Sequence, residues 1–456
     1  MLPSKPMILP APSKLPDVEP PISQAYHVRL PVDADSQLDL SFASDPLAKL
    51  VALFAVHGDA FSVYSPSVQR QVCVFSHPEH VRHVLVDHHA RYIKGIGIER
   101  VRILLGNGLM ASEGDLWRSQ RKMIQPGFHR SVLAGMVGHV MLANENLARR
   151  WRQAAHSGSP INLTQDMSEV TLEVVLRALF GERYETLVTP TENPFAILTE
   201  ETERNLTFAY RFRALTSLLK REIEWRRSTG YGGTDLVRLL MEARDRKSDQ
   251  RMSDRQMLDE IMTLIVAGHE TTASALNWLW YLVSKDSTVE HRLHVEADGQ
   301  PDPDENGHAV SQVPFTSAVV QETLRLYPPG WLLTRRSITA DAIGDYLLPP
   351  DTDVLISPYL VHRHPLFWRD PERFDPDRFL ASGTPVERFA YLPFGLGPRA
   401  CIGEQLATME MQSHVVRIAR EFRLEFDDRG AVEMESQVNL RTRAPVFMRL
   451  HLRAAA

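Results

Sequence analysis

A glycine- and proline-rich loop that leads directly into a helix constrains this chain more than any other feature, because one cysteine stands at the junction. Cys401 lies in the middle of the stretch 391–407. The N-terminus of a helix supplies free backbone N–H groups and the positive end of the helix dipole, which favour the thiolate form of a cysteine. Three surrounding glycines, Gly395, Gly397 and Gly403, let the backbone approach a flat group closely and adopt positive φ where a tight turn needs it.

The residues around Cys401 suit a metal-bound cofactor better than an isolated thiol. Arg399, two positions earlier, is a permanent cation that can pair with a carboxylate, and Phe394 provides an aromatic wall. A thiolate in an apolar cradle beside a cation is suited to the axial position of haem iron. The simpler interpretation, a buried cysteine in a glycine-rich turn, would apply to a cysteine without these neighbours.

A long apolar helix is the second constraint on the chain. Ser253 and Gln256 form a capping-box pattern that predicts its start, and the apolar residues that follow on all sides are typical of a core helix. Its middle carries the run Ala267-Gly-His-Glu-Thr-Thr272. Small residues there let a flat cofactor pack against the helix, and an acid beside a hydroxyl, Glu270 and Thr271, can pass protons to a bound oxygen species. The alternative is a kinked core helix whose polar groups are bonded locally.

The pattern Phe394-x-x-Gly-x-Arg-x-Cys-x-Gly403 resembles the haem-binding loop of the cytochrome P450 family, and the run on the long helix is similar to that family's oxygen-side motif. The resemblance runs from about residue 26 to the end. It implies a mainly α fold with a small β subdomain, in which haem b lies between the long central helix and the helix after the cysteine. It also implies a metal-ligand role for Cys401, cofactor-binding roles for Arg399, Phe394, Gly403, Ala267 and Gly268, and catalytic roles for Thr271 and Glu270.

Further site residues follow from the same resemblance. Trp117 and Arg121 are four residues apart and share a helix face, where an indole N–H and a guanidinium can hold a carboxylate. The resemblance assigns this pair to a haem propionate, together with Arg399. After the run Trp331-Leu-Leu-Thr, strand alternation and spacing favour Arg336 over Arg335 as the further propionate partner.

Two more groups are implied by the resemblance. A structural network joins Glu322, Arg325 and Arg373, the last within Pro371-Glu-Arg-Phe374. The substrate pocket is expected to include Ile98, Leu109, Trp331, Leu332, Leu333 and Val438. These apolar side chains indicate an apolar small-molecule substrate, but they do not identify it.

Composition excludes some partners and compartments. The 456 residues carry a formal net charge of −6, which argues against nucleic acid as a partner. There are only two cysteines, Cys73 and Cys401, so a metal-bound Cys401 excludes a disulfide and indicates a reducing, cytoplasmic compartment. Residues 1–25 form a proline-rich tail without the apolar run of a transmembrane anchor, and residues 26–456 are expected to form one haem-thiolate domain, as in bacterial-type members.

The expected reaction is insertion of one oxygen atom from O2 into the substrate by hydroxylation or epoxidation. The chain has no room for a fused reductase, so electrons from NAD(P)H should arrive through a ferredoxin or flavodoxin with its reductase, at a monomeric enzyme. Arg118, Arg121, Lys122 and Arg399 could form part of a cationic docking face. Two alternatives stay open: a peroxygenase or isomerase that does not activate oxygen, and a haem-binding sensor or carrier without turnover.

Local patterns predict several elements outside the motifs. A hairpin is expected from Phe61-Ser-Val-Tyr64 and Val72-Cys-Val-Phe75, and another from the strands 346–348 and 354–356. The family resemblance, rather than a local pattern, implies that residues 91–111 form a loop over the substrate side of the cofactor. The stretch between Gly181 and Trp225 is short for the family, so how it covers the pocket is left open.

Overall fold

The computed structural model describes residues 30–41, 45–189, 192–199, 206–246, 248–301, 313–383 and 386–454. The expected tail, residues 1–25, lies outside the described residues. The described chain is mainly helical, as predicted. The helices are α1 (Pro46–His57), α2 (Pro78–Arg82), α3 (Ile98–Leu105), α4 (Gly114–Ile124), α5 (Arg130–Ala134), α6 (Val137–Ser157), α7 (Leu163–Phe180), α8 (Tyr184–Leu187), α9 (Leu206–Thr229), α10 (Leu236–Glu242), α11 (Asp254–Ser284), α12 (Ser287–Asp298), α13 (Pro314–Leu326), α14 (Pro358–Val361) and α15 (Glu404–Glu421).

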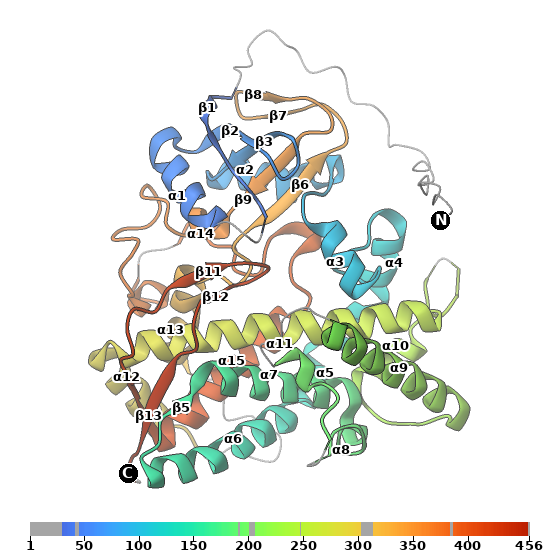
Figure 1. Ribbon diagram of the computed structural model, residues 1–456, viewed down its shortest axis with the longest axis vertical. Coiled ribbons are helices and arrows are strands. Elements are labelled where there is room, and N and C mark those ends of the chain that lie inside the picture. Colours follow the sequence, from blue (N-terminus) through green and yellow to red (C-terminus); the bar gives the residue numbers. More distant parts are fainter. Residues whose placement is uncertain are drawn as a thin grey trace.

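The strands form one larger sheet and three small ones. They are β1 (Val32–Gln37), β2 (Ala60–Ser65), β3 (Arg70–Phe75), β4 (Tyr92–Lys94), β5 (Ile161–Asn162), β6 (Leu333–Ser337), β7 (Asp341–Ile343), β8 (Tyr346–Leu348), β9 (Asp353–Ile356), β10 (Phe422–Phe426), β11 (Met434–Ser436), β12 (Leu440–Thr442) and β13 (Phe447–Leu452). The larger sheet has the order β1-β2-β3-β9-β6-β4, and the small sheets are β10-β13-β5, β11-β12 and β7-β8. The larger sheet lies at one end of the molecule, with most helices at the other (Figure 1).

Helix α11 crosses the middle of the molecule, as its apolar surface predicts (Figure 1). Its start at the Ser253 capping box is confirmed, because the Ser253 side chain accepts from the Gln256 N–H and the Gln256 side chain accepts from the Ser253 N–H. Helix α7 packs so closely against it that a Cβ at Gly268 would stand 2.9 Å from a methyl carbon of Val175. The helix continues without a bulge through its central polar run.

One of the two predicted hairpins is confirmed and the other is wrong. Strands β2 and β3 pair antiparallel from Ala60 opposite Phe75 to Ser65 opposite Arg70. Strand β8 instead pairs with β7, while β9 pairs with β6 and β3. Strand β8 pairs with β7 because only Gly344 and Asp345 separate the two strands. Gly344 has the positive φ of 56° that such a tight turn needs.

The expected loop over the pocket contains regular structure. Strand β4 pairs antiparallel with β6, which places Lys94 opposite Arg335, and helix α3 follows after Gly97. Residues 95–97 before α3 and residues 106–113 between α3 and α4 remain irregular. The loop is therefore much shorter than predicted and is tied at both ends to helices.

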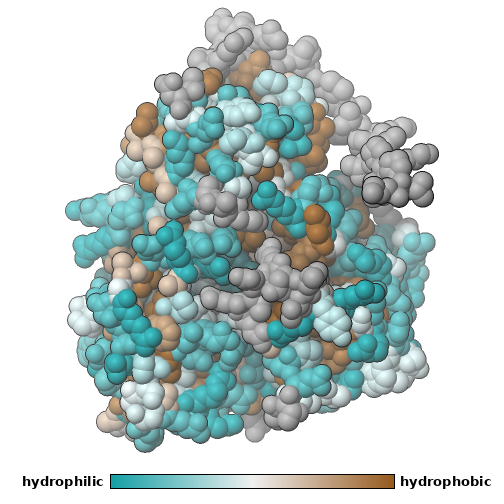
Figure 2. Space-filling view, in the orientation of Figure 1, coloured by the Kyte–Doolittle hydropathy of each residue, from teal (hydrophilic) through white to brown (hydrophobic). Residues whose placement is uncertain are grey.

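Hydrophilic residues dominate the face drawn in Figure 2, with apolar residues in small scattered groups. Within the residues that the structure describes, none of the helices combines the length and the apolar character needed to cross a bilayer.

Candidate active site

Cys401 stands where the loop enters α15, at the position that the sequence predicts. Its N–H donates to the Phe394 carbonyl at 2.8 Å, which closes the loop. The loop needs glycine at Gly397, where φ is 70° and a Cβ would lie 1.9 Å from the Leu85 carbonyl oxygen. Gly403, with φ −88°, has no such need, and its expected conformational role is not observed.

The electrostatics of the Cys401 thiol combine two opposing effects. Burial raises its pKa, whereas the backbone N–H groups of Gly403 and Glu404 and the nearby Arg121 lower it. The helix N-terminus therefore faces the sulfur as expected, but burial outweighs it in the protein chain alone. A coordinated metal ion deprotonates a thiol outright. The residue is nevertheless exposed, so a ligand can reach it.

Three cations gather around one carboxylate near the cysteine loop. Glu113 accepts from the backbone N–H of Lys94 at 2.7 Å and from the Arg399 guanidinium. Burial lowers the pKa of Lys94 to about 7 and of Arg335 to about 10, and repulsion from Arg399 contributes to both shifts. Among the described contacts of these three cations, only the Arg399 guanidinium forms an ion pair with a carboxylate, so this cluster favours a further anionic group.

The surroundings of the two arginines of β6 favour Arg335 as the propionate partner, whereas spacing in the sequence favours Arg336. Arg336 forms a two-pronged ion pair with the buried Asp353, at 2.9 and 3.1 Å. Arg335 lies on the opposite side of the strand, opposite Lys94 and near Arg399. Successive side chains of a strand point to opposite faces, so the sequence indicates that only one of the two arginines can face the site. Which one it is depends on how β6 pairs with β4 and β9.

Trp117 and Arg121 lie on α4 beside this cluster. The guanidinium carbon of Arg399 stands 4.3 Å from the centre of the Trp117 ring. Arg121 donates to the Ala400 carbonyl at 2.9 Å, next to the cysteine. Burial lowers the pKa of Arg121, so a nearby anion would stabilise its charge as well.

These residues fit a haem group. A haem carries two propionate carboxylates, which match the excess positive charge of Lys94, Arg335 and Arg399 over Glu113. The cysteine supplies the thiolate that a haem iron accepts as axial ligand. The donor set and the charge therefore agree on the same group.

The predicted acid and hydroxyl lie on α11, with one partner that the sequence does not indicate. The Glu270 carboxylate accepts from the side-chain amide of Asn439 at 2.9 Å. Thr271 donates its hydroxyl proton to the Ala267 carbonyl at 2.8 Å, which leaves its oxygen as an acceptor. Asn439 lies in a turn 169 residues away, so no local pattern connects it to Glu270.

The cofactor-packing role of Gly268 is not supported by its surroundings. The site of its absent Cβ faces Val175 on α7, so glycine is needed there for the contact between two helices. Ala267 is half-buried and lies one residue away around the helix. Its predicted role beside the cofactor stays a prediction.

The predicted pocket residues come from three separate apolar clusters. Leu109 packs with α11, Leu333 packs beneath the larger sheet, and Trp331 and Leu332 pack with α1 and its neighbours. The indole N–H of Trp331 donates to the Gln437 carbonyl at 2.9 Å, which ties it to the turn that holds Asn439. Ile98 is half-buried and Val438 is exposed.

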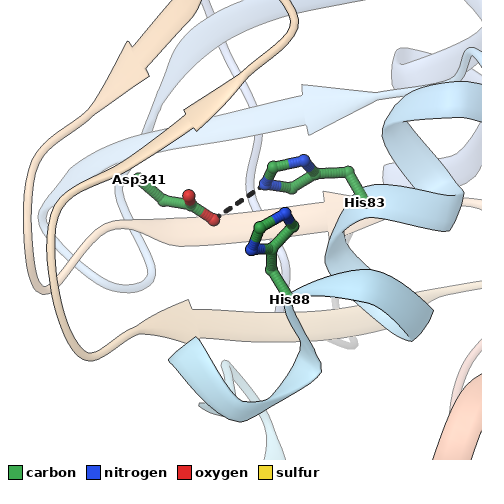
Figure 3. A group of neighbouring side chains, drawn as sticks. All are labelled: His83, His88 and Asp341. Carbon is green, nitrogen blue, oxygen red and sulfur yellow. Dashed lines mark hydrogen bonds and ion pairs between the residues drawn. The ribbon is translucent and has the colours of Figure 1, made fainter. Parts of the chain in front are cut away.

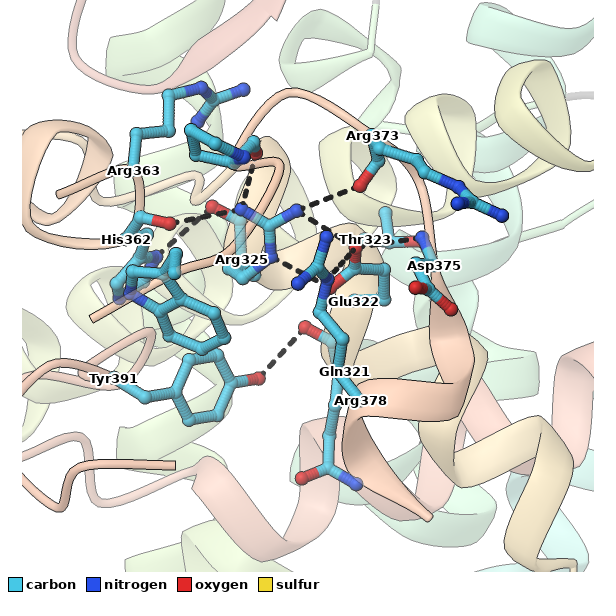
Figure 4. Close-up of polar contacts among 12 residues, drawn as sticks. Gln321, Glu322, Thr323, Arg325, His362, Arg363, Arg373, Asp375, Arg378 and Tyr391 are labelled. Carbon is cyan, nitrogen blue, oxygen red and sulfur yellow. Dashed lines mark hydrogen bonds and ion pairs between the residues drawn. The ribbon is translucent and has the colours of Figure 1, made fainter. Parts of the chain in front are cut away.

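The structural network differs from its prediction in one member (Figure 4). Arg325 binds the Glu322 carboxylate with two hydrogen bonds of 2.7 and 2.8 Å, and both residues are fully buried. Arg373 contributes only its backbone carbonyl, while its side chain points away. Arg378 is the second arginine whose side chain approaches Glu322, at 3.4 Å. The motif Pro-(Glu/Asp)-Arg-Phe occurs twice, five residues apart, and the prediction chose the first copy.

A group of His83, His88 and Asp341 resembles a metal site (Figure 3). Asp341 already accepts from His83, Arg91, Tyr92 and its neighbour Ala342. The two imidazole rings are stacked with centres 4.1 Å apart, so their nitrogens do not converge on one point. We therefore interpret this group as a hydrogen-bond network that joins β7 to the helical turn after α2 (His83–Asp87) and to the start of β4.

Comparison with known proteins agrees with the geometry. A family model described as Cytochrome P450 matches residues 36–225 and 211–447. Cyclooctatin synthase of Streptomyces melanosporofaciens is 34% identical over 405 residues, which cover 84% of this chain and 87% of the relative. Cyclooctat-9-en-7-ol 5-monooxygenase of the same species is 32% identical over 402 residues, covering 83% and 85%.

A solved structure shows the same fold. The crystal structure of the cytochrome P450DA heme domain aligns with a TM-score of 0.83, covering 94% of this chain and 99% of that chain. The sequences are 22% identical, so this likeness concerns the fold alone.

Proposed function

Because this chain belongs to the cytochrome P450 family, we propose that it is a haem-thiolate monooxygenase that inserts one oxygen atom from O2 into an apolar small organic molecule. The observation that carries the proposal is the position of Cys401, an exposed residue just before α15 and beside a cluster of cations. A thiolate and an excess of buried positive charge are together what a haem with two propionates requires.

Each residue of the site has a separate task in this proposal. Cys401 holds the iron, and Arg335, Arg399 and Lys94 neutralise the propionates. Trp117 and Arg121 support the same charges from α4. When bound, haem supplies the centre at which O2 is activated.

Proton movement is assigned to α11. The side-chain amide of Asn439 donates a hydrogen bond to the Glu270 carboxylate. The Thr271 hydroxyl donates to the Ala267 carbonyl, so its oxygen can still accept a hydrogen bond from another group. A carboxyl group and a hydroxyl on adjacent residues can therefore exchange a proton through one water molecule. Fixing both side chains within the buried helix keeps this exchange at one place.

The electron donor is proposed to be a separate ferredoxin or flavodoxin. Lys122 and Arg118 are exposed on α4, close to the helix face that supports the cysteine loop, although Arg118 pairs with Asp115 at 2.8 Å. Exposed cations there would attract an acidic partner.

The substrate is proposed to have a hydrocarbon skeleton. One relative is named a monooxygenase of cyclooctat-9-en-7-ol, an alcohol with a carbon–carbon double bond. The predicted pocket residues of this chain, such as Leu109 and Trp331, are apolar and buried. An unsaturated cyclic hydrocarbon or its alcohol is therefore the first class to test.

The carbon-monoxide difference spectrum of the reduced holoprotein tests the haem assignment. We expect the red-shifted Soret band of a thiolate-bound haem, because Cys401 is the proposed ligand. Cys401→Ser should lose that band, while Cys73→Ser, which changes the only other cysteine, should keep it. A persistent thiolate band in Cys401→Ser would contradict the ligand assignment.

Oxygen consumption with reductase and substrate tests the proton-transfer assignment. Thr271→Ala should keep the thiolate band but divert electrons to peroxide, because the hydroxyl beside Glu270 is lost. Unchanged coupling of electrons to product would overturn that role. Peroxide-supported turnover alone would favour a peroxygenase, and ligand-induced spectral shifts without any product would favour a sensor or carrier.

A further inference from the structure

The irregular segment 106–112 is bound to α11 by two consecutive carboxylates. The Asn107 N–H donates to Asp259 at 2.9 Å, and the Leu109 N–H donates to Glu260 at 2.9 Å. Each carboxylate therefore holds a backbone group that no helix or strand satisfies. The segment lies against the N-terminal half of α11, where α3 and α4 approach that helix (Figure 1).

The two glycines of the segment are required by this contact. A Cβ at Gly106 would lie 2.2 Å from a carboxylate oxygen of Asp259. A Cβ at Gly108 would lie 2.3 Å from the Thr263 hydroxyl oxygen. Both distances are far below van der Waals contact, so the backbone approaches α11 as closely as only glycine permits.

The carbonyl groups of the same segment bind to other elements. Lys94 of β4 donates to the carbonyls of Leu109 at 3.2 Å and Met110. Gln120 of α4 donates to the Asn107 carbonyl at 3.0 Å. The segment is thus held from α11, β4 and α4 together, and Leu109 is bound through both its N–H and its carbonyl.

Five buried oxygen atoms in or around this segment have no hydrogen-bond partner among the described residues. They are Oε1 of Glu260, Oε1 of Gln120, Oδ1 of Asn107, Oγ of Ser112 and Oγ1 of Thr263. The side chains of Glu260 and Gln120 are fully buried, and Thr263 is 4% exposed. Unpaired buried acceptors are rare, and water molecules are the usual donors that satisfy them.

We propose that Glu260 is a positioning residue of the substrate pocket, which holds Leu109 in place and, together with the unpaired oxygens of Gln120, Asn107 and Thr263, binds internal water. The inference rests on the proposed function, because Leu109 is a predicted pocket residue. Removing the carboxyl group releases the Leu109 N–H and leaves the water without one of its partners. The segment then shifts, and the shape of the pocket changes with it.

The charge of Glu260 agrees with this role. Its pKa is raised to about 7, mainly by burial and in part by the neighbouring Asp259. The Leu109 N–H and Lys94 act in the opposite direction. The carbonyl oxygen of the neutral acid still accepts from Leu109, and its hydroxyl supplies a donor to the unpaired oxygens. Glutamine offers the same acceptor and a comparable donor. Glu260→Gln should therefore keep the hydrogen bonds of the native residue, whereas Glu260→Leu should lose them.

The experiment compares Glu260→Leu and Glu260→Gln in the haem-loaded protein. Glu410 supplies the matched controls, Glu410→Leu and Glu410→Gln, because it is also a buried acid with an unpaired oxygen but lies on α15. Hydrogen exchange of the peptide covering 105–112 should accelerate about tenfold in Glu260→Leu and return to the wild-type rate in Glu260→Gln. Neither control should change this peptide.

Two azole ligands of haem iron report the pocket. The ratio of the dissociation constants for phenylimidazole and imidazole, from Soret titrations, should change by about fivefold in Glu260→Leu only, because the bulkier probe contacts the segment. Normal exchange and an unchanged ratio in Glu260→Leu would overturn the inference. A wild-type protein without a thiolate–haem spectrum would instead contradict the proposed function, while the exchange result would still test the bond to Leu109.

Thr263→Val tests the water separately. It removes one unpaired hydroxyl without changing the shape of the side chain. If water is bound, the variant should accelerate exchange of the same peptide about threefold. An unchanged or slower rate would show that the oxygens hold no water and would overturn that part of the proposal.

Discussion

Arg335 is a cation whose neighbours disfavour its charge. It is largely buried, it lies near Arg399 and Lys94, and Glu113 is the one carboxylate of this cluster. Its ionised form is therefore costly in the protein chain alone and becomes favourable beside a dianionic ligand. Arg336, the next residue, already has its partner in Asp353.

Substitution of the two neighbouring arginines should separate cofactor binding from stability. Arg335→Leu should weaken haem binding about tenfold, because one propionate partner is lost, while the free energy of unfolding without haem stays the same or rises. Arg336→Leu should lower that free energy by about 1–3 kcal/mol, because it leaves the buried Asp353 with a weaker partner. Haem titration and urea unfolding measure the two effects.

The reverse result would reassign the roles. If Arg336→Leu weakened haem binding and Arg335→Leu did not, the strand would present the opposite face to the cofactor. Arg70, which stands 3.6 Å from Asp353, partly compensates for the loss of Arg336 and sets the lower end of the expected range.

At the scale of elements, the end of α13 is joined to the segment before the cysteine loop by charged side chains. The Glu322 carboxylate accepts hydrogen bonds from the Arg325 side chain of the same helix and from the backbone N–H of Asp375. It also pairs with the Arg378 side chain, three residues after Asp375. Arg378 also donates to the Asp370 carbonyl at 2.9 Å. The junction holds the segment 370–378 against α13.

The two arginines of the repeated motif should differ in their effect on stability. Arg378→Ala should lower the free energy of unfolding by about 2 kcal/mol, because the fully buried Glu322 loses a charged partner. Arg373→Ala should cost less than about 0.5 kcal/mol, since its contribution is a backbone carbonyl that alanine retains. Urea unfolding of both variants makes the comparison, and equal losses would contradict the assignment.

At the scale of the whole molecule, two fully buried histidines link separate parts of the core. Their hydrogen bonds require the neutral form of each ring. His414 accepts from the Trp280 N–H at 3.0 Å and bonds Asn144 through its other nitrogen at 2.6 Å. His362 accepts from the Leu392 N–H at 2.9 Å and bonds the Arg325 carbonyl. Because a nitrogen that accepts carries no proton, both rings are neutral. Burial lowers the pKa of each to about 3.

These histidines should make the protein less stable in acid. The folded pKa lies below the unfolded value of 6.5, so between pH 6.5 and 3 the unfolded chain binds protons that the folded chain does not. Each histidine therefore lowers the free energy of unfolding by up to about 1.4 kcal/mol for every pH unit below 6.5. Above pH 6.5 both states are neutral at this residue, and it causes no loss of stability. His414→Gln should be less stable at pH 7 but lose stability less steeply in acid.

Urea unfolding at several pH values measures this difference. The comparison between wild type and variant is needed because Glu260 and Glu410, whose pKa values burial raises, act in the opposite direction above pH 4.5, in the case of Glu260 up to about pH 7. Parallel curves for wild type and His414→Gln would show that His414 does not titrate in this way.

Much of the fold, and the position of Cys401 at the start of a helix, could be predicted because their signals are local. The capping box at Ser253 and the apolar run after it predict α11, and a cysteine between glycines at a helix start predicts a ligand position. Pairing partners were less accessible, as β8 and β9 show, because alternation identifies a strand but not its neighbour. The repeated Pro-(Glu/Asp)-Arg-Phe motif offered two equivalent candidates, and sequence alone could not separate Arg373 from Arg378.

Residue order alone was enough to indicate the family and the residue types of the candidate site, namely a cysteine at a helix start and an acid beside a hydroxyl on a buried helix. These signals depend on residues adjacent in the chain. The tertiary structure decided which side chains share a site. Arg335 rather than Arg336, Asn439 beside Glu270, and Glu260 beneath Leu109 are all contacts between distant elements, and their geometry exists only once those elements are packed together.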